Sequence, residues 1–234
     1  MKYAIIAAGE GSRLVQEGIK VSKPLIKLNG IALIDRLIDV FMKNDAESIS
    51  IIVNNEMKDV QSHIISLHSS ISVPMNIVVK STPSSMHSFF ELSQFLQTGK
   101  FCLTTVDTIF KEDEFSQFIQ AFVADDEIDG MMAVTDYIDD ESPLYVGVDD
   151  KMKINGFFDR TDQAYKYISG GIYCLSPKAI TTLNYCMKNG LSRMRNYQRQ
   201  LIADGLNLKA FSFGKIVDVD HVKDIMKAEA FLIS

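Results

Sequence analysis

The residues with the clearest chemistry lie in a glycine-containing segment close to the N-terminus. Residues 8–13 read AGEGSR and follow directly on an apolar run at residues 2–8. Glycine lacks a Cβ atom, so the main chain can approach a ligand closely at Gly9 and Gly11, and consecutive loop amides can cradle a phosphate. The guanidinium of Arg13 adds a charge-assisted fork for phosphate oxygens. The segment therefore predicts an anion-binding loop, with a Gly-x-Gly turn that binds nothing as the alternative.

Two better-known phosphate-binding patterns do not fit this loop. A dinucleotide-binding fingerprint needs a third glycine or alanine where Leu14 stands, and an acid at the end of the second strand, where the sequence has Asn54. A P-loop needs GxxxxGK followed by Ser or Thr, which is absent. Lys23 lies ten residues beyond Arg13, and Pro24 stiffens the backbone beside it. The pair favours a triphosphate clamp, although either basic residue alone would also fit a solvated surface charge.

Three aspartates could hold a divalent metal ion. Asp107 ends the apolar run at 101–106, while Asp218 and Asp220 alternate along a strand, so both carboxylates face one side. Mg²⁺ binds through one or two carboxylates plus substrate phosphates, and a strand-end carboxylate can reach it. The alternatives are a helix cap at Asp107 and solvated strand-edge acids at the other two positions.

Alternating strands and helices must position these residues. Apolar runs predict strands at 2–8, 48–53, 73–79 and 101–106, and helical periodicity predicts helices at 31–43, 57–67, 85–97 and 112–123. After residue 128 we expect strands at 130–136, 144–149, 152–158, 167–175, 206–213 and 215–219, and helices at 177–187, 193–203 and 222–232. This order predicts an α/β fold, a mostly parallel, Rossmann-like α/β/α sandwich with an antiparallel second half. Without a repeat or low-complexity linker, we expect one domain over 1–234, with halves at 1–127 and 128–234.

Composition narrows the class of protein. The 234 residues are 47% apolar and carry 24 Lys and Arg against 30 Asp and Glu, a net charge of -6. A chain of this length and apolar fraction can bury its own core. The negative net charge disfavours a nucleic-acid partner, because proteins that bind nucleic acids usually carry an excess of basic residues. Residues 125–162 hold 12 acidic and 3 basic side chains, interpreted as a solvated face, and the mildly basic remainder suits a small anionic ligand.

The cysteines and apolar runs bear on the compartment. Cys102, Cys174 and Cys186 are odd in number and show no CxxC spacing, so neither a disulfide framework nor a zinc site is expected. No apolar run approaches the ~20 residues of a membrane helix, and the N-terminal run is too short for a signal peptide. We therefore expect a cytoplasmic protein without a membrane partner. The basic stretch at 193–199 is interpreted as a solvated helix face, with contact to the acidic segment 125–162 as the alternative.

The sequence AAGEGSRL at 7–14, followed by SKPL at 22–25, resembles the nucleotidyltransferase family. This is the group of sugar-1-phosphate nucleotidylyltransferases and phosphocholine cytidylyltransferases with a GT-A-like fold. Its pattern is usually G-x-G-[TS]-R and then P-K-P, so Ser22 stands where the first proline is common. The resemblance implies metal binding by Asp107 and by a terminal D-x-D, Asp218 and Asp220. The resemblance spans nearly the whole chain, and these motifs follow one another in the family's order.

The same resemblance implies residues for a phosphorylated acceptor. ISGGIY at 168–173 is similar to the family's segment that closes over the acceptor, and KINGFFDR at 153–160 is similar to a turn that ends in an acidic–basic pair. The acceptor residues implied are Asp159, Arg160 and Gly171, with plain turn charges as the alternative for the first two. Residues 82–88 occupy the place where relatives contact the nucleobase, and they could instead cap the next helix.

The resemblance implies a Mg²⁺-dependent enzyme of nucleotide-sugar biosynthesis. It would join an NTP to a phosphorylated acceptor, a sugar 1-phosphate in the first place, and release pyrophosphate. Residues 1–127 would be the nucleotide-binding half and 128–234 the acceptor-binding half, with Arg13 and Lys23 as catalytic residues. The nucleotide-binding residues would be Ala8, Gly9, Glu10, Gly11, Ser12 and Arg13. The alternatives are a phosphocholine-type acceptor, a GT-A-type glycosyltransferase and a catalytically inactive nucleotide-sensing module, and a homo-oligomer stays open.

Overall fold

The computed structural model describes residues 1–68, 70–139, 141–160 and 165–234. At its centre is a nine-stranded sheet, and seven of its strands follow the order β10-β9-β11-β6-β1-β4-β5. The other two strands lie off this path: β8 pairs with β11, and β12 pairs with β8. The strands of this sheet are β1 (Lys2–Ala7), β4 (Ser48–Val53), β5 (Met75–Val79), β6 (Phe101–Thr105), β8 (Gly130–Thr135), β9 (Tyr145–Val148), β10 (Ile154–Phe158), β11 (Tyr167–Leu175) and β12 (Leu208–Phe213).

Strand direction differs between the two halves of this sheet. β1 pairs in parallel with β4 and β6, and β4 pairs in parallel with β5. β11 is antiparallel to β6, β8 and β9. The predicted α/β class is confirmed, and within the mostly antiparallel second half β12 pairs in parallel with β8. The chain places β4 and β5 on one side of β1 and then returns to β6 on the other, so the strand order reverses beside β1, where sheets of this kind bind ligands.

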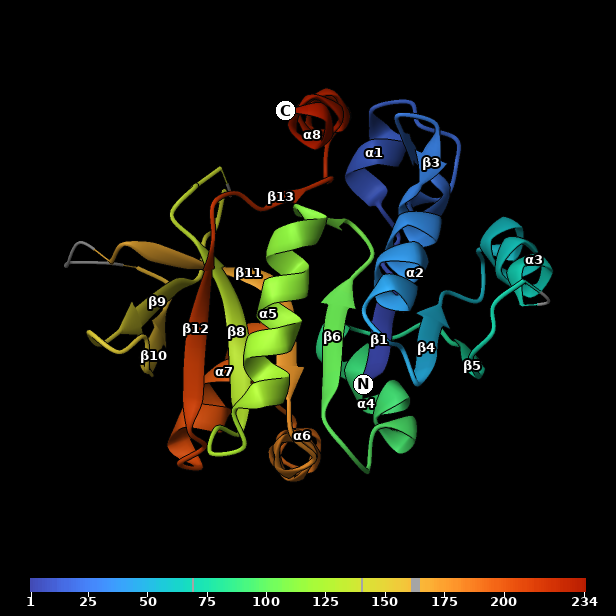
Figure 1. Ribbon diagram of the computed structural model, residues 1–234. Coiled ribbons are helices and arrows are strands. Elements are labelled where there is room, and N and C mark those ends of the chain that lie inside the picture. The colour runs from blue at the N-terminus through green and yellow to red at the C-terminus, as the bar shows by residue number, and fades with distance from the viewer. Residues whose placement is uncertain (69, 140, 161–164) are drawn as a thin grey trace.

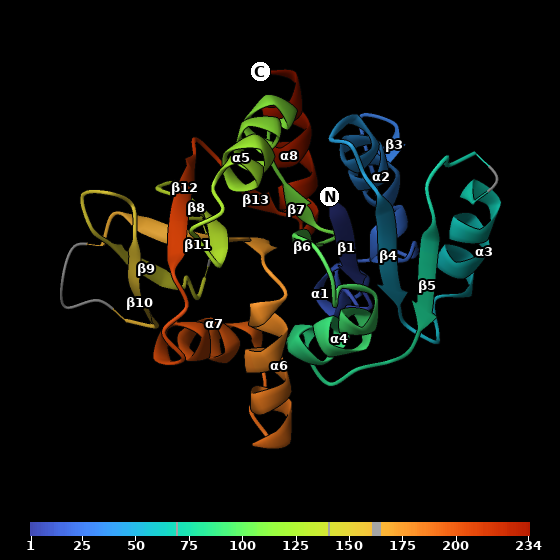
Figure 2. The same cartoon turned by 60° about the horizontal axis from the view of Figure 1, so that its bottom comes forward.

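Helices cover both faces of the sheet (Figure 1), and the turned view separates the two layers (Figure 2). One core receives buried residues from α2 (Leu33–Lys43), α3 (Lys58–Leu67), α5 (Glu112–Ala124) and α8 (Val222–Ile233). The other receives them from α4 (Ser85–Leu92), α6 (Lys178–Lys188) and α7 (Met194–Ala203). Because both faces are covered, central β1 is apolar along its length, and Tyr3, Ala4 and Ile5 are fully buried.

Several short elements escaped the periodicity analysis. They are the helix α1 (Ser12–Gln16), the 3₁₀ turns η1 (Lys23–Leu25) and η2 (Ser93–Phe95), and the strands β2 (Lys27–Leu28), β3 (Ile31–Ala32) and β7 (Thr108–Ile109). The strand expected at 215–219 is present but shorter, as β13 (Val217–Asp218). The helix expected at 31–43 begins two residues later because β3 pairs with β2. The helix expected at 85–97 ends at Leu92 and continues as η2. Two-residue strands carry too little pattern to be read from sequence.

The cysteines and the lengths of the helices bear on the expectations about disulfides and membrane spans. All three cysteines are buried and free, as expected from their odd number and spacing. No helix within the described residues combines the length and the apolar character needed to cross a membrane.

Candidate active site

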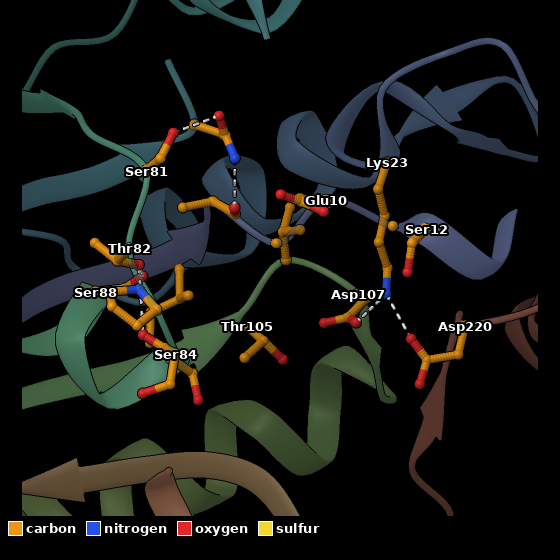
Figure 3. Close-up of a pocket in the computed structure, with 18 of the residues that line it drawn as sticks. Glu10, Ser12, Lys23, Ser81, Thr82, Ser84, Ser88, Thr105, Asp107 and Asp220 are labelled. Carbon is orange, nitrogen blue, oxygen red and sulfur yellow. Dashed lines mark hydrogen bonds and ion pairs between the residues drawn. The ribbon is translucent and has the colours of Figure 1, made fainter. Parts of the chain in front are cut away.

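A cleft of about 730 Å³ lies where β1, β4 and β6 end. Its walls come from the loop after β1, the end of β4, the loop after β5, the end of β6 and the segment before α8. Figure 3 shows these side chains gathered around one space. The residues that line it include 8–13, Lys23, Asn54, 81–85, Ser88, 105–107 and Asp220.

The glycine loop after β1 forms one wall of this cleft. Gly11 has φ 61°, a left-handed conformation that glycine adopts without strain. A Cβ atom at Gly11 would lie 3.1 Å from Cβ of Lys23, so the lysine side chain passes directly beneath the loop. At Gly9 a Cβ would meet no atom within 4 Å. Here the main chain faces open space, as a loop that receives a ligand requires.

Lys23 joins the two carboxylates of the cleft (Figure 3). Its ammonium makes an ion pair with Asp107 and lies 2.7 Å from Oδ1 of Asp220. Nη1 of Arg13 lies 3.2 Å from the other carboxylate oxygen of Asp220. The Lys23 side chain is 9% exposed and that of Asp220 is 44% exposed. Two cations and two anions thus neutralise one another at the floor and rim of the cleft.

Strand pairing explains how residues far apart in sequence meet here. Asp107 lies two residues beyond the end of β6, and β7 begins at the next residue. β7 pairs antiparallel with β13, so that Thr108 faces Asp218 in the register. The amide of Val219 donates a hydrogen bond of 3.1 Å to the carbonyl of Asp107. The C-terminal acidic segment is therefore fixed beside the end of β6.

The charges of this cluster shift its pKa values. Burial alone would lower the pKa of Lys23, but the carboxylates of Asp107 and Asp220 outweigh it and raise that pKa to about 12. Burial would likewise raise the pKa of Asp107, but the Lys23 ammonium beside it holds that pKa below the usual carboxyl range. Both groups are therefore charged at neutral pH.

Asp218 differs from the other two predicted metal residues. Its side chain reaches solvent, yet the surrounding protein desolvates the carboxylate, and the charges of Asp107 and Asp220 add to this, so its pKa rises to about 8. Oδ1 of Asp218 accepts a hydrogen bond of 3.1 Å from Thr108, whose hydroxyl also lies 2.8 Å from that of Thr105. Asp218 lines a second hollow rather than the main cleft.

That second hollow, of about 100 Å³, adjoins the cleft. It shares Arg13 and Asp220 with the cleft, and hydroxyl groups of Thr135, Tyr137 and Ser169 contribute to its wall. The remaining polar lining is mostly acidic, from Asp139, Glu141, Asp218 and Asp224, with His221 and Lys223 beside them. The arrangement provides two adjacent binding spaces with one arginine and one carboxylate at their junction.

Asn54 is a cleft residue that the sequence did not single out as functional. It is 6% exposed at the end of β4. Its Oδ1 accepts hydrogen bonds from the Ser81 hydroxyl (2.8 Å) and the Glu56 amide (3.0 Å), while Nδ2 donates to the carbonyl of Ala8 (3.3 Å). One side chain thus joins the start of the glycine loop to the polar loop opposite. The sequence signal that could have identified Asn54 is its position as a polar residue directly after the apolar strand at 48–53.

Comparison with known proteins identifies the family. The sequence profile of the nucleotidyl transferases matches residues 2–234. The chain belongs to the nucleotidyl transferase family. It is accordingly an enzyme that transfers a nucleotidyl group, and the resemblance seen in its N-terminal motifs is confirmed.

Several solved structures share the fold of this chain. A protein assigned as a glucose-1-phosphate thymidylyltransferase from Bacillus anthracis, crystallised with sucrose, is 18% identical with a TM-score of 0.85, over 99% of this chain and 94% of that one. The inositol-1-phosphate CTP transferase from T. maritima is 21% identical with a TM-score of 0.78, over 98% and 94%. HddC from Yersinia pseudotuberculosis is 18% identical with a TM-score of 0.75, over 98% of each chain. No curated protein sequence matches the chain.

The structure brings together most of the residues predicted for this nucleotidyl transferase. The six predicted nucleotide-binding residues at 8–13 line the cleft, together with Lys23, Asp107 and Asp220. Lys23 and Arg13 both pair with Asp220 in the absence of a ligand, a contact between predicted catalytic and predicted metal residues that sequence spacing did not indicate.

The predicted acceptor residues lie elsewhere. Asp159, Arg160 and Gly171 are absent from the lining of either space, and Gly170 lines the second hollow instead. Asp159 makes ion pairs with Arg195 (2.5 Å) and Arg199 (2.7 Å) of α7. The acceptor role of these residues stays a prediction without support from the geometry. The pairing also shows that Arg195 and Arg199 of the basic stretch 193–199 contact the acidic segment 125–162, while about a third of each arginine side chain stays exposed to solvent.

The family pattern implies a metal ion, and the donor set can be tested for it. No group of three or more His, Cys, Asp or Glu that could hold a metal occurs among the residues that the structure describes. Asp107 and Asp220 nevertheless both contact a single cation, the Lys23 ammonium. Two carboxylates with the remaining ligands left to substrate phosphates and water are the donor set that Mg²⁺ prefers. The two carboxylates therefore fit a magnesium ion whose other ligands come from phosphate and water.

Proposed function

We propose that this nucleotidyl transferase joins an NTP to the phosphate of a small phosphorylated acceptor, a sugar 1-phosphate in the first place, and releases pyrophosphate. The observation that carries the proposal is the pair of adjoining spaces with Arg13 and Asp220 at their junction. The larger space would hold the NTP and the smaller one the acceptor. The names of the thymidylyltransferase and the inositol-1-phosphate CTP transferase, whose fold the chain shares, support this class of acceptor.

The reaction requires positioning and charge stabilisation rather than a covalent intermediate. A phosphate oxygen of the acceptor attacks the α-phosphorus in line. The bond from that phosphorus to the oxygen that bridges to the β-phosphorus breaks, and pyrophosphate leaves with the electron pair. Arg13, at the junction of the two spaces, would stabilise the charge on the α-phosphate, and Lys23 would contact the triphosphate.

Other residues of the cleft would hold the two ends of the nucleotide. Residues 9–12 line the space where phosphates would lie, and Gly9 leaves the main chain open to them. Opposite, Ser81, Thr82 and Ser84 offer hydroxyl groups to the nucleoside. Asn54 connects these two walls and would keep their separation constant.

Mg²⁺, held by Asp107 and Asp220, would neutralise phosphate charge when bound. Asp218 would serve the acceptor side, because it lines the smaller space and is held there by the Thr108 hydroxyl. Carboxylates and hydroxyl groups around that space suit the hydroxyl groups of a sugar or another polyol.

Pyrophosphate release tests the proposal. The protein is incubated with Mg²⁺ and each of the four NTPs, against a panel of sugar 1-phosphates, inositol 1-phosphate and phosphocholine, with each NTP alone as the control. We expect at least one pair to release pyrophosphate in equal amount to an NDP-linked product. Turnover with phosphocholine alone would assign the cytidylyltransferase type of acceptor. Transfer from a nucleotide sugar, with no pair of the matrix active, would refute the proposal and favour a glycosyltransferase.

A further inference from the structure

The Lys23 ammonium occupies the position between the two carboxylates that fit a metal ion. It pairs with Asp107 and lies 2.7 Å from Asp220. Arg13 holds the remaining oxygen of Asp220 at 3.2 Å. The two predicted metal residues are therefore neutralised by basic side chains of the same chain.

The local structure holds this lysine in place. Lys23 begins the 3₁₀ turn η1, with Pro24 fixing the backbone next to it. Its aliphatic stem runs under Gly11, where even one added Cβ would be 3.1 Å from Cβ and 3.5 Å from Cδ of the lysine. The side chain is 9% exposed, so it is not a freely moving surface lysine.

We propose that Lys23 is a resident counter-ion that keeps a divalent cation out of the Asp107–Asp220 site until a triphosphate draws the ammonium away. This inference rests on the proposed function, because it takes the triphosphate as the group that Lys23 meets next. It follows that metal binds together with the nucleotide and not before it.

Electrostatic repulsion explains why Lys23 would weaken the binding of a divalent cation. With Lys23 present, a divalent cation must approach an ammonium within a few ångströms, and their repulsion exceeds thermal energy even at the effective dielectric constant of a protein surface. Removing the ammonium leaves two carboxylates with only the arginine of the rim beside them. The site then attracts a cation directly, without the help of a nucleotide.

The test measures Mn²⁺ binding to the nucleotide-free protein by electron paramagnetic resonance. Lys23→Met keeps the length and apolar stem of the side chain and removes its charge. We expect its dissociation constant for Mn²⁺ to fall at least about tenfold below that of the wild type. The gain should disappear in the double variant Lys23→Met, Asp107→Asn.

Lys43→Met is the matched control. Lys43 also bridges two carboxylates, lying 2.7 Å from Asp39 and 3.0 Å from Glu112, but it is 55% exposed and remote from the cleft. Solvent screens its partners, so its loss should leave Mn²⁺ affinity unchanged. An equal gain in both variants would show a general effect of removing a lysine and would overturn the proposal.

Two further results would overturn it: tight Mn²⁺ binding by the wild type that Asp107→Asn removes, or unchanged affinity in Lys23→Met. If the methionine variant fails to fold, Lys23→Gln replaces it, since glutamine retains hydrogen-bond donors without the charge, and the same outcomes apply. No nucleotide or acceptor enters this titration. Its failure is thus distinct from a failure of the proposed function, which only the pyrophosphate assay reports.

Discussion

Replacing Gly11 with alanine adds one methyl group directly above the Lys23 side chain. Gly11 has φ 61°, and the added Cβ would lie 3.1 Å from Cβ of Lys23. The left-handed conformation costs an L-residue roughly 1–2 kcal/mol, and the lysine stem must also shift by a few tenths of an ångström. We expect the free energy of unfolding to fall by about 1–2 kcal/mol, which corresponds to a decrease in Tm of roughly 2–8 °C for a chain of this size.

Thermal unfolding followed by circular dichroism measures this effect against Gly9→Ala. A Cβ at Gly9 would meet no atom within 4 Å, and Gly9 is not among the residues with positive φ. The control should stay within about 0.5 kcal/mol of the wild type. Gly11→Asn separates the two causes, because asparagine tolerates the left-handed conformation better than alanine but retains the added atoms.

Equal Tm values for Gly9→Ala and Gly11→Ala would refute the reasoning, because the loop would then not rest on the lysine stem. A loss in Gly11→Ala that Gly11→Asn fully restores would assign the cost to backbone conformation alone. A loss that persists in both Gly11 variants would assign it to contact with Lys23.

Three further predictions concern stability. Asn54→Ala removes one side chain that bonds Ala8, Glu56 and Ser81; we expect a loss of about 1–3 kcal/mol in urea unfolding, and an unchanged midpoint would contradict this. Arg193 has φ 71° and ψ 139°, so Arg193→Gly should raise stability by about 1 kcal/mol, and a lower Tm would contradict it. Burial opposes the shift, but Lys178 and the Asn207 amide lower the pKa of Asp129. The wild type should therefore be more stable than Asp129→Asn above the ordinary carboxyl pKa range, and this difference in stability should fade as pH falls through the lowered pKa. A Tm difference between the two proteins that is the same at pH 7 and pH 3 would contradict this.

Much of the parallel half of the fold follows from sequence, because β1 and β4 are largely buried, mostly apolar runs and α2 has a clear apolar face. The predicted strand at 48–53 and the strand at 167–175 coincide with β4 and β11. The resemblance implied that Asp107 and the C-terminal aspartates share a site, and the pairing of β7 with β13 brings them together. The elements that escaped are short ones, such as α1, β2, β3 and β7, which carry too little pattern to be read from sequence.

The details of the site depended on partners that spacing along the chain does not reveal. Lys23 and Arg13 were expected to await phosphate, and both instead pair with Asp220 in the ligand-free protein. Asp159 was expected beside the acceptor, but Arg195 and Arg199 of α7 hold it. In the sequence, Asn54 was noted only because it stands where a dinucleotide-binding fingerprint needs an acid, but its side chain joins two walls of the cleft. Each of these contacts crosses at least 27 residues of sequence.

Pyrophosphate release by Asp107→Asn, measured with an NTP and acceptor pair that the wild type uses, tests most directly whether the cluster of Lys23, Asp107 and Asp220 is the catalytic centre. We predict a fall of at least about 100-fold in turnover, with the circular dichroism spectrum unchanged. Asp39→Asn, which changes an exposed carboxylate paired with Lys43, should retain full activity. Turnover of Asp107→Asn within threefold of the wild type would contradict the assignment.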